Sequence, residues 1–479
     1  MNLTLSDTEA ILEEAARIAR EYLAGHADRD EPVVRYLAPD ALRRRFALEP
    51  PARGRPFEDL LEDVRETLRY SVRSGHPGFS NQLFGGYDVA AIVGEWMTAL
   101  LNTSMYTYEV APVFTLMELA LIRHMCGFVG WSDGEGVFTP GGSIANLMAL
   151  LAARNRALPH ANVDGLRPDD RLALFLSDEA HYSVTRASSV AGLGTSAAHK
   201  VPVDALGRMR PDDLRARIAD ARSDGLRPFF LSATASTTVA GAFDPLEELA
   251  EIAAEHGMWL HVDASYGGGV LLSKEHRELM NGCDRADSIT WNPHKMMGVP
   301  LACSALLIRE KGRLAATNSL HADYLFHDNE AASYDMGDLT LQCGRRVDAL
   351  KLWLSWQALG DEGHEERIDH LFELADTMRE MVVERPAFEL IRYPQACNIC
   401  FRYVPPALRD AEESNDRRHR LGELTVKIRE RLREEGRLLT NYAPLDGVPV
   451  FRWVASNPRV TRDDLELLLD EIERTGAEF

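Results

Sequence analysis

Residues 258–269 read MWLHVDASYGGG and combine a short apolar run with an acid and three glycines. The run from 258 to 262 is apolar except for His261, a pattern typical of a strand buried in a parallel sheet. Asp263 follows this strand directly, and α/β sheets place their ligand contacts at the carboxyl ends of strands. The glycines leave room for the backbone to approach a flat molecule. The alternative is that Asp263 caps a following helix.

Other short apolar runs alternate with helical patterns along the middle of the chain. Four further strands are predicted, at residues 171–176, 228–233, 287–291 and 301–308. Between them, residues 211–221 and 245–256 have the spacing of amphipathic helices. This alternation predicts an α/β fold with a buried, mostly parallel central sheet.

The two ends of the chain have a different pattern. Residues 5–23 carry apolar side chains at helical spacing, with Ser6 as the expected cap. Beyond about Lys351, long helical patterns alternate with strand-like segments, which predicts a smaller α+β lobe. The polar stretch 405–420 is expected to be a mobile loop. We therefore expect an N-terminal helical segment at 1–98, a large domain at 99–355 and a small C-terminal domain at 356–479.

The composition limits the partners of the protein. Asp and Glu number 74 against 53 Lys and Arg, which gives the 479 residues a net charge of −21. Such a charge repels phosphate backbones and anionic lipids, so we expect neither nucleic-acid nor membrane binding. No uninterrupted apolar run approaches about 18 residues, and the N-terminus lacks the blocks of a signal peptide. The cysteines are expected to be reduced thiols, without a metal site, in a cytoplasmic protein.

Lys295 stands in a setting unlike that of the other lysines. Residues 291–298 read WNPHKMMG and continue from the predicted strand 287–291, which places the amine just beyond the end of that strand. A lysine desolvated there becomes a usable nucleophile, because burial disfavours the charged ammonium form. The alternative is a lysine that extends along the protein surface with its amine in water.

Two more segments carry groups suited to a phosphorylated ring. Residues 138–146 read FTPGGSIAN and lead into a helical run, where Gly142 and Ser143 can offer N–H groups to an anion. Residues 178–183 read DEAHYS and follow a strand, so His181 is placed to stack on a flat ring. Taken singly, the first segment is more simply explained as a plain turn, and a lone histidine such as His181 is more often structural.

Together these segments describe one cofactor site. Pyridoxal phosphate (PLP) needs a seat for its phosphate, an amine for its aldehyde and a carboxylate against its pyridine nitrogen. The carboxylate keeps the ring protonated, so that the ring accepts electrons when a bond at Cα breaks. Gly142, Ser143, His181, Asp263 and Lys295 supply a phosphate seat, a stacking group, an acid and an amine in this chain order.

Nine segments resemble the group II PLP-dependent decarboxylases, in the branch of glutamate decarboxylase and cysteine sulfinate decarboxylase. The resemblance covers the chain from about His76 to the C-terminus. The segments are GHPGFSNQL, NTSMYTYEVAPVF, FTPGGSIAN, LSATASTTVAGAFDP, HVDASYGGG, NPHKMMGVPLACSALL, SYDMGD, LQCGRRVDALKLW and FRWVASNP. It implies the aspartate-aminotransferase-like architecture called fold type I, and a homodimer with active sites shared between the subunits.

The resemblance also implies roles for individual residues. Lys295 would hold PLP as a Schiff base, Asp263 would pair with the pyridine nitrogen, and His181 would stack on the ring. Tyr334, on a mobile loop supplied by the partner subunit, would return a proton to Cα after carbon dioxide leaves. Further cofactor contacts are expected from Gly142, Ser143, Ser265 and His294. Substrate contacts are expected from Gln82, Phe84, Ser104, Tyr106 and Arg452.

Two of these positions bear on the substrate. Phe84 and Tyr106 match the cysteine sulfinate side of the branch. Phe84 takes up room and favours a side chain shorter than that of glutamate, while the Tyr106 hydroxyl can bond an acidic oxygen. Cysteine sulfinate, cysteate or aspartate are therefore the expected substrates, with glutamate and phosphonoalanine as alternatives. One methylene is worth only roughly 1–3 kcal/mol, so mixed specificity is expected.

Other functions remain as rivals at this point. The same cofactor supports transamination and oxidative aldehyde synthesis, although Tyr334 argues against the aldehyde route because rapid protonation leaves little carbanion for oxygen. A binding protein on a decayed enzyme scaffold is a further alternative. Retention of His181, Asp263 and Lys295 argues against it.

Overall fold

The computed structural model describes residues 4–320, 326 and 330–479 and contains two compact units. The large unit consists of Tyr87–Glu373 with Arg392–Asn398. The small unit consists of Met1–Gly86, Leu374–Ile391 and Ile399–Phe479. The three-part division at residues 98 and 355 stays a prediction.

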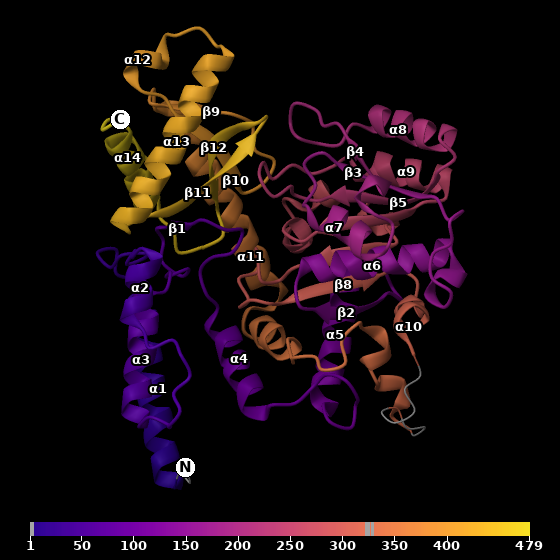
Figure 1. Cartoon of the computed structure of the whole chain (residues 1–479), viewed down its shortest axis with the longest axis horizontal. Helices are drawn as coiled ribbons and strands as arrows, with labels where there is room; N and C mark the ends of the chain where they lie inside the picture. The colour runs from indigo at the N-terminus through magenta and orange to yellow at the C-terminus, as the bar shows by residue number, and fades with distance from the viewer. Residues whose placement is uncertain (1–3, 321–325, 327–329) are drawn as a thin grey trace. The chain divides into compact units, whose positions relative to one another are not determined.

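A seven-stranded sheet forms the centre of the large unit (Figure 1). Its strand order is β2-β8-β7-β6-β5-β3-β4. Four neighbouring pairs are parallel, and only β8 pairs antiparallel, with β7 and with β2. The strands are β2 (Glu135–Thr139), β3 (Leu172–Ser177), β4 (Ala198–Val201), β5 (Arg227–Thr234), β6 (Trp259–Ala264), β7 (Ser288–Trp291) and β8 (Ser304–Ile308). The predicted α/β fold with a mostly parallel sheet is confirmed.

Apolar residues on both faces explain why this sheet forms. Every residue of β3, β6, β7 and β8 is buried, which requires cover on both faces. α6 packs across β2 and β5 to β8, while α8 and α9 pack on β5. The helices of the unit are α4 (Val89–Leu101), α5 (Pro112–Val129), α6 (Gly142–Ala157), α7 (Ser183–Val190), α8 (Pro211–Ser223), α9 (Leu246–His256) and α10 (Arg313–Asn318). Short 3-10 segments include η3 (Gly267–Leu272), η6 (Ala332–Tyr334) and η7 (Gly337–Leu339).

Helix α5 is long and apolar enough to cross a membrane by length and composition alone. The sequence was expected to contain no such segment because no long apolar run is uninterrupted. α5 is interrupted by the charged residue Glu118. Within the large unit, α5 packs against β2 and β8, and Glu118 is buried in an ion pair with Arg345. These contacts are those of a core helix.

The small unit is built on a five-stranded sheet of order β1-β11-β12-β10-β9. β11 and β12 form a hairpin around Asp446 and Gly447, whose positive φ values of 51° and 77° suit a tight turn. The strands are β1 (Phe79–Ser80), β9 (Phe388–Leu390), β10 (Asn398–Tyr403), β11 (Leu439–Leu445) and β12 (Val448–Val454). The helices are α1 (Leu5–Ala24), α2 (Pro39–Arg45), α3 (Phe57–Tyr70), α12 (Pro406–Arg409), α13 (Asn415–Glu435) and α14 (Arg462–Gly476). α11 (Ala349–Glu384) is broken at Gly360; its residues up to Glu373 belong to the large unit, and only those from Leu374 onward belong to the small unit.

Two local predictions in this unit were wrong. Thr4, and not Ser6, caps α1, because Thr4 and Asp7 form a reciprocal capping box. The stretch 405–420 is not a continuous loop: it contains α12 and the first turn of α13, whose N-cap Ser414 accepts from the Arg417 N–H. Charged side chains hid these helix starts, because neither presents a long apolar stripe.

Candidate active site

Asp263 lies at the carboxyl end of β6, opposite Thr290 of the parallel strand β7. One carboxylate oxygen, Oδ1, accepts the Ser265 backbone N–H at 3.1 Å, and Oδ2 accepts the Asn146 Nδ2–H at 2.7 Å. Burial by itself raises the pKa of Asp263, but hydrogen bonds from the side chains of Ser265 and Asn146 and the nearby charge of Lys295 hold it below its usual value. A buried, ionised acid therefore stands where the sequence placed one.

Lys295 follows β7 in a tight turn and is half-buried. Its backbone N–H donates to the Asn292 carbonyl, and its own carbonyl accepts from Gly298, both at 3.0 Å. Its positive charge lowers the pKa of both Asp263 and His181. The structure therefore brings the predicted amine, acid and stacking imidazole within electrostatic reach of one another.

The predicted phosphate loop forms the N-terminus of α6. Gly141 precedes the helix with φ 124°, and Gly142 is its first residue. The first N–H groups of a helix have no carbonyl in their own helix to bind, and the helix dipole attracts an anion there. A Cβ on Gly142 would lie 2.6 Å from Ser265 Oγ and 2.9 Å from Asn292 Nδ2, so these donors surround the helix start. Ser143 is exposed beside them.

Asn292 was not predicted to be a site residue, although it stands in a quoted segment. Its Oδ1 accepts the Ser304 hydroxyl hydrogen at 2.5 Å, which turns its amide nitrogen toward Gly142. A polar amide within a run of buried residues was the available signal.

The two predicted histidines are both neutral groups. Burial is the main cause that lowers the pKa of His181. Burial also lowers the pKa of His294 to about 4, and its Nδ1 lies 2.6 Å from the Cys303 carbonyl oxygen. A neutral His294 can bind a phosphate by a hydrogen bond, but it adds no positive charge to the site.

Residues 104–106 are held by the segment that follows the predicted catalytic tyrosine. The Arg345 backbone N–H donates to Ser104 Oγ at 3.1 Å, and the Met105 N–H donates to the Arg345 carbonyl at 2.8 Å. The Tyr106 carbonyl accepts from the N–H groups of Met336 and Gly337 at 3.1 and 2.9 Å. The predicted substrate residues Ser104 and Tyr106 are therefore both hydrogen-bonded to residues 336–345 of the same chain.

A buried ion pair fixes this junction and was missed by the sequence analysis. Arg345 Nη1 binds both oxygens of Glu118 at 2.7 and 2.8 Å, with side chains only 4% and 0% exposed. Glu118 Oε1 also accepts the Phe138 N–H at 3.0 Å, and Arg345 Nη2 donates to the Met105 carbonyl at 3.3 Å. The charge of Glu118 within an apolar helix was the only sequence signal.

Tyr334 ends the short segment η6 and is 41% exposed. Its ring centroid lies 5.4 Å from that of Tyr108. The Tyr108 N–H donates to Asp335 Oδ1 at 2.8 Å, which joins the two segments next to the ring pair. Tyr334 is thus anchored beside the segment that carries Tyr106, while its side chain is accessible.

The remaining predicted residues belong to the small unit. Arg452 of β12 is buried, and its Nη2 donates to the Asn81 carbonyl at 2.8 Å. The cross-strand neighbour Asn441 donates to the same carbonyl at 3.0 Å. Next to Asn81, Gln82 is exposed, and Phe84 is half-buried with its ring centroid 6.0 Å from that of Phe79. Their place relative to Lys295 stays a prediction.

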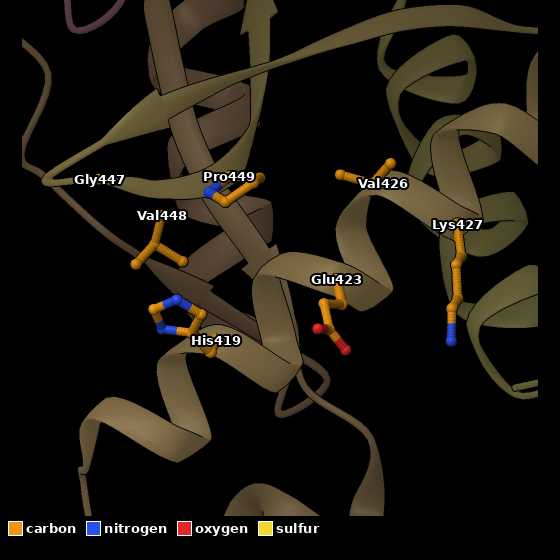
Figure 2. A pocket seen from close by; sticks show the side chains of 7 residues that line it. All are labelled: His419, Glu423, Val426, Lys427, Gly447, Val448 and Pro449. Carbon is orange, nitrogen blue, oxygen red and sulfur yellow. The ribbon is translucent and has the colours of Figure 1, made fainter.

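A separate pocket of about 340 Å³ lies in the small unit (Figure 2). Figure 2 shows His419 and Glu423 of α13 beside the β11–β12 turn at Gly447. Its lining includes none of the predicted site residues. The full lining is His419, Glu423, Val426, Lys427, Gly447, Val448 and Pro449.

The groups of the large unit fit PLP. The start of α6 and Ser265 offer uncharged donors for a phosphate, and Gly142 leaves the space that a Cβ would fill. Asp263 is an ionised acid for a pyridine nitrogen, and Lys295 is an amine within its electrostatic reach. Each chemical group of the cofactor therefore has a partner of matching chemistry.

Comparison with known proteins identifies the class. Residues 39–404 match the pyridoxal-dependent decarboxylase conserved domain, and the chain belongs to this family. It is thus a PLP-dependent amino acid decarboxylase, as the sequence predicted.

Individual relatives narrow this class. The chain is 45% identical over 454 residues to human cysteine sulfinic acid decarboxylase, covering 94% of this chain and 92% of that protein. It is 42% identical over 476 residues to acidic amino acid decarboxylase GADL1 of Bos taurus, covering 98% of this chain and 91% of that protein. The resemblance to this branch is confirmed.

Solved structures agree with the predicted fold type I. The crystal structure of mouse CSAD in apo form matches with a TM-score of 0.95 at 42% identity, covering 99% of each chain. The structure of Oryza sativa TDC with PLP and tryptamine matches with a TM-score of 0.91 at 26% identity, covering 100% of this chain and 99% of that one.

Proposed function

We propose that this enzyme decarboxylates a small acidic L-amino acid, with cysteine sulfinate as the favoured substrate and cysteate or aspartate next. The observation that carries the reaction is the buried, ionised Asp263 within electrostatic reach of Lys295. The substrate class is supported by the relatives, whose names specify cysteine sulfinic acid and acidic amino acids.

Five residues of the large unit would hold the cofactor. Lys295 would bind the aldehyde as a Schiff base, Asp263 would pair with the pyridine nitrogen, and His181 would stack on the ring. Gly142 and Ser143 would bind the phosphate through the start of α6. Bound PLP supplies an electron-accepting ring, which stabilises negative charge at Cα when carbon dioxide leaves.

Arg452 would bind an acidic group of the substrate. Its Nη2 donates to the neutral carbonyl of Asn81, which holds this buried guanidinium in place. An arginine presents two parallel N–H groups to a carboxylate or sulfinate, which fixes orientation as well as position. Such orientation selects the bond to the α-carboxylate as the one that breaks.

Tyr334 would return the proton to Cα. Its phenol is accessible, while its backbone is anchored next to Tyr108 and Asp335. A tyrosine on a segment that closes over the substrate is a suitable general acid, because closure both positions it and excludes water.

The substrate assignment is tested by carbon dioxide release from purified protein with PLP. The substrates compared are cysteine sulfinate, cysteate, aspartate, glutamate, phosphonoalanine and an aromatic amino acid. We expect the first three to react fastest. Glutamate as the sole good substrate would contradict the roles given to Phe84 and Tyr106, and hydrogen peroxide release would indicate an aldehyde synthase.

The cofactor assignment has its own test. Borohydride reduction should attach PLP to the peptide that contains Lys295, and Lys295→Ala should abolish labelling and activity. Lys274→Ala is the matched control, because Lys274 is 80% exposed and pairs with Glu365. Labelling of another side chain would overturn the assignment.

We also propose a homodimer. Six large apolar side chains of α4 are exposed at helical spacing, with Leu100 at 66%, and they form a stripe suited to burial by a second chain. They are Val89, Val93, Trp96, Met97, Leu100 and Leu101. Mixing Lys295→Ala with Tyr334→Phe should restore activity if the partner supplies Tyr334, because each mixed dimer then has one intact site. No recovery after confirmed subunit exchange would contradict shared sites.

A cytoplasmic location is proposed as well. Five of the six cysteines are buried, as expected of thiols that stay reduced. Fractionation of the producing cells, followed by detection of the enzyme, tests the location.

A further inference from the structure

Asn146 is a buried amide in the first turns of α6, and it contacts four polar side chains of the large unit. Its Nδ2 lies 2.7 Å from Asp263 Oδ2 and 3.0 Å from Ser183 Oγ. Its Oδ1 lies 2.8 Å from Thr290 Oγ1 and 3.1 Å from His261 Nε2. Both ends of the amide are therefore used in full.

The ionised carboxylate fixes which way this amide points. A carboxylate only accepts hydrogen bonds, so the group facing Asp263 must be the NH₂ end of Asn146. The oxygen end then faces Thr290 and His261, and an amide oxygen only accepts. His261 Nε2 must therefore carry a hydrogen.

The far side of His261 agrees with this assignment. Burial lowers the pKa of His261 to about 4, so the ring is neutral and its Nδ1 has a free lone pair. Nδ1 lies 2.8 Å from Ser288 Oγ, whose oxygen accepts the Trp259 Nε1–H at 2.7 Å. The Ser288 hydroxyl hydrogen is thus left to donate to His261. From Trp259 through Ser288, His261 and Asn146 to Asp263, each group donates to the next one, so no two donors or two acceptors face each other.

The second amide hydrogen of Asn146 sets a second group. It is donated to Ser183 Oγ, which leaves the Ser183 hydroxyl hydrogen for His181 Nδ1 at 2.8 Å. The Ser183 backbone N–H also points at His181 Nδ1, at 3.3 Å. With two donors directed at Nδ1, neutral His181 carries its hydrogen on Nε2.

We propose that Asn146 is a positioning residue that locks the Asp263 carboxylate and selects the Nε2–H form of His181 through one amide. The proposal rests on the PLP contacts given above to Asp263 and His181. With Oδ1 held by Ser265 and Oδ2 by Asn146, the carboxylate cannot rotate, and its charge is not neutralised because both donors are uncharged. One amide thereby sets the acid at the pyridine nitrogen and the imidazole at the ring face.

Two substitutions separate this role from simple packing. Asn146→Ala removes both donors, and Asn146→Asp keeps the size but places a carboxylate against Asp263, which repels it. We expect both to weaken PLP binding by roughly tenfold or more, as when an outer partner of a bound group is lost. We expect both to lower kcat more than they change KM, and to shift the pH at which the PLP absorbance band changes.

The matched controls lie close by. Asn155→Ala removes an amide from the same helix, where its Oδ1 accepts from Arg154, and should leave PLP affinity and the absorbance titration unchanged. Thr290→Val keeps the volume but removes one of the two donors to Asn146 Oδ1, so it should shift the same readouts in the same direction by less. Wild-type readouts in Asn146→Ala would overturn the proposal.

A measurement on the wild-type protein reads the two tautomers directly and uses variants only to assign the signals. Nitrogen-15 NMR of histidine-labelled protein without PLP should show the Nε2–H form for His181 and His261, assigned by loss of each signal in His181→Gln and His261→Gln. The Nδ1–H form at either ring would contradict the proposal. If the wild type instead fails to bind PLP at Lys295, the proposed function fails while the NMR result stands.

Discussion

Asp263 shows how a single buried side chain stays charged. Two uncharged donors and the nearby charge of Lys295 outweigh the cost of burial, so its pKa lies below the usual value. His261, two residues earlier on the same strand, is also buried, but its contacts with Asn146 and Ser288 suit a neutral ring. On the same strand, Asp263 is therefore charged and His261 is neutral, because their hydrogen-bond partners differ.

Phe84 is expected to limit the length of the substrate side chain. Phe84→Ala should enlarge the pocket and raise glutamate turnover relative to cysteine sulfinate, by roughly 1–3 kcal/mol in kcat/KM for one methylene. The ratio of the two kcat/KM values measures the effect. Phe46→Ala, a change at another half-buried phenylalanine of the small unit, is the control. An unchanged ratio would remove Phe84 from the substrate pocket.

Some residues of the site were accessible to sequence reasoning and others were not. Asp263, Lys295 and the glycine of α6 stand at the ends of recognisable strands or at a helix start, where position alone suggests ligand contact. Asn146 and Arg345 act through partners more than 100 residues away in the chain, such as Asp263 and Glu118. No local pattern reveals such partners, because they meet only after the sheet has formed.

Helix α5 and the segment 104–106 are held together by the pair of Glu118 and Arg345. Glu118→Gln should leave the buried Arg345 charge without its partner and lower the free energy of unfolding by about 3–5 kcal/mol. Urea denaturation measures the loss. Asp133→Asn is the control, because it removes an exposed pair with Lys311 that is worth at most about 1 kcal/mol. Equal effects would contradict the importance of burial.

The start of η7 packs tightly against the Tyr106 ring. A Cβ on Gly337 would lie 2.7 Å from Tyr106 Cε2, so Gly337→Ala must displace the ring or the segment after Tyr334. We expect a higher KM for the acidic substrate and a lower kcat, each by roughly tenfold, as small misplacement of site groups is costly. Gly344→Ala in the same stretch meets nothing within 4 Å and should have wild-type kinetics. Equal kinetics for both variants would contradict this contact.

At the level of elements, the strands were predictable because they are short, apolar and followed by turns. β5 to β7 lie within two residues of their predicted bounds. Pairing direction was not predictable for β8, whose apolar sequence suits either orientation. α4 and the helical turns within 405–420 were also missed. α4 is apolar on most of its faces, and residues 415–420, which begin α13, read NDRRHR and carry no apolar side chain, so neither segment shows the amphipathic pattern of a surface helix.

Acid sensitivity belongs to the whole molecule. Burial lowers the pKa of His261, His294 and His364 from 6.5 to about 4, so these rings are neutral in the folded protein. Between pH 6.5 and 4 the unfolded chain binds more protons at these sites than the folded one, and stability falls as the pH falls. Each histidine contributes on the order of 1–3 kcal/mol over this range.

The measurement is the urea midpoint at pH 7 and pH 5. His364→Leu should reduce the loss of stability between them, because neither ring nitrogen of His364 has a hydrogen-bond partner among the described residues. His370→Leu, at a partly exposed position, should leave the loss unchanged. A pH dependence identical in His364→Leu and wild type would exclude this histidine as a source.

The alignment of β6 with β7 has a consequence for the origin of activity. Asp263 stands beside Thr290 in this pairing, and Lys295 follows five positions further on. Side chains alternate between the two faces of a sheet, so a slip of one residue would turn the acid to the wrong side while leaving the amine where it is. The neighbours Val262 and Ile289 are apolar and buried, so they resist such a slip and thereby keep Asp263 on the correct face. A packing defect at this pair would abolish activity without altering any reacting group.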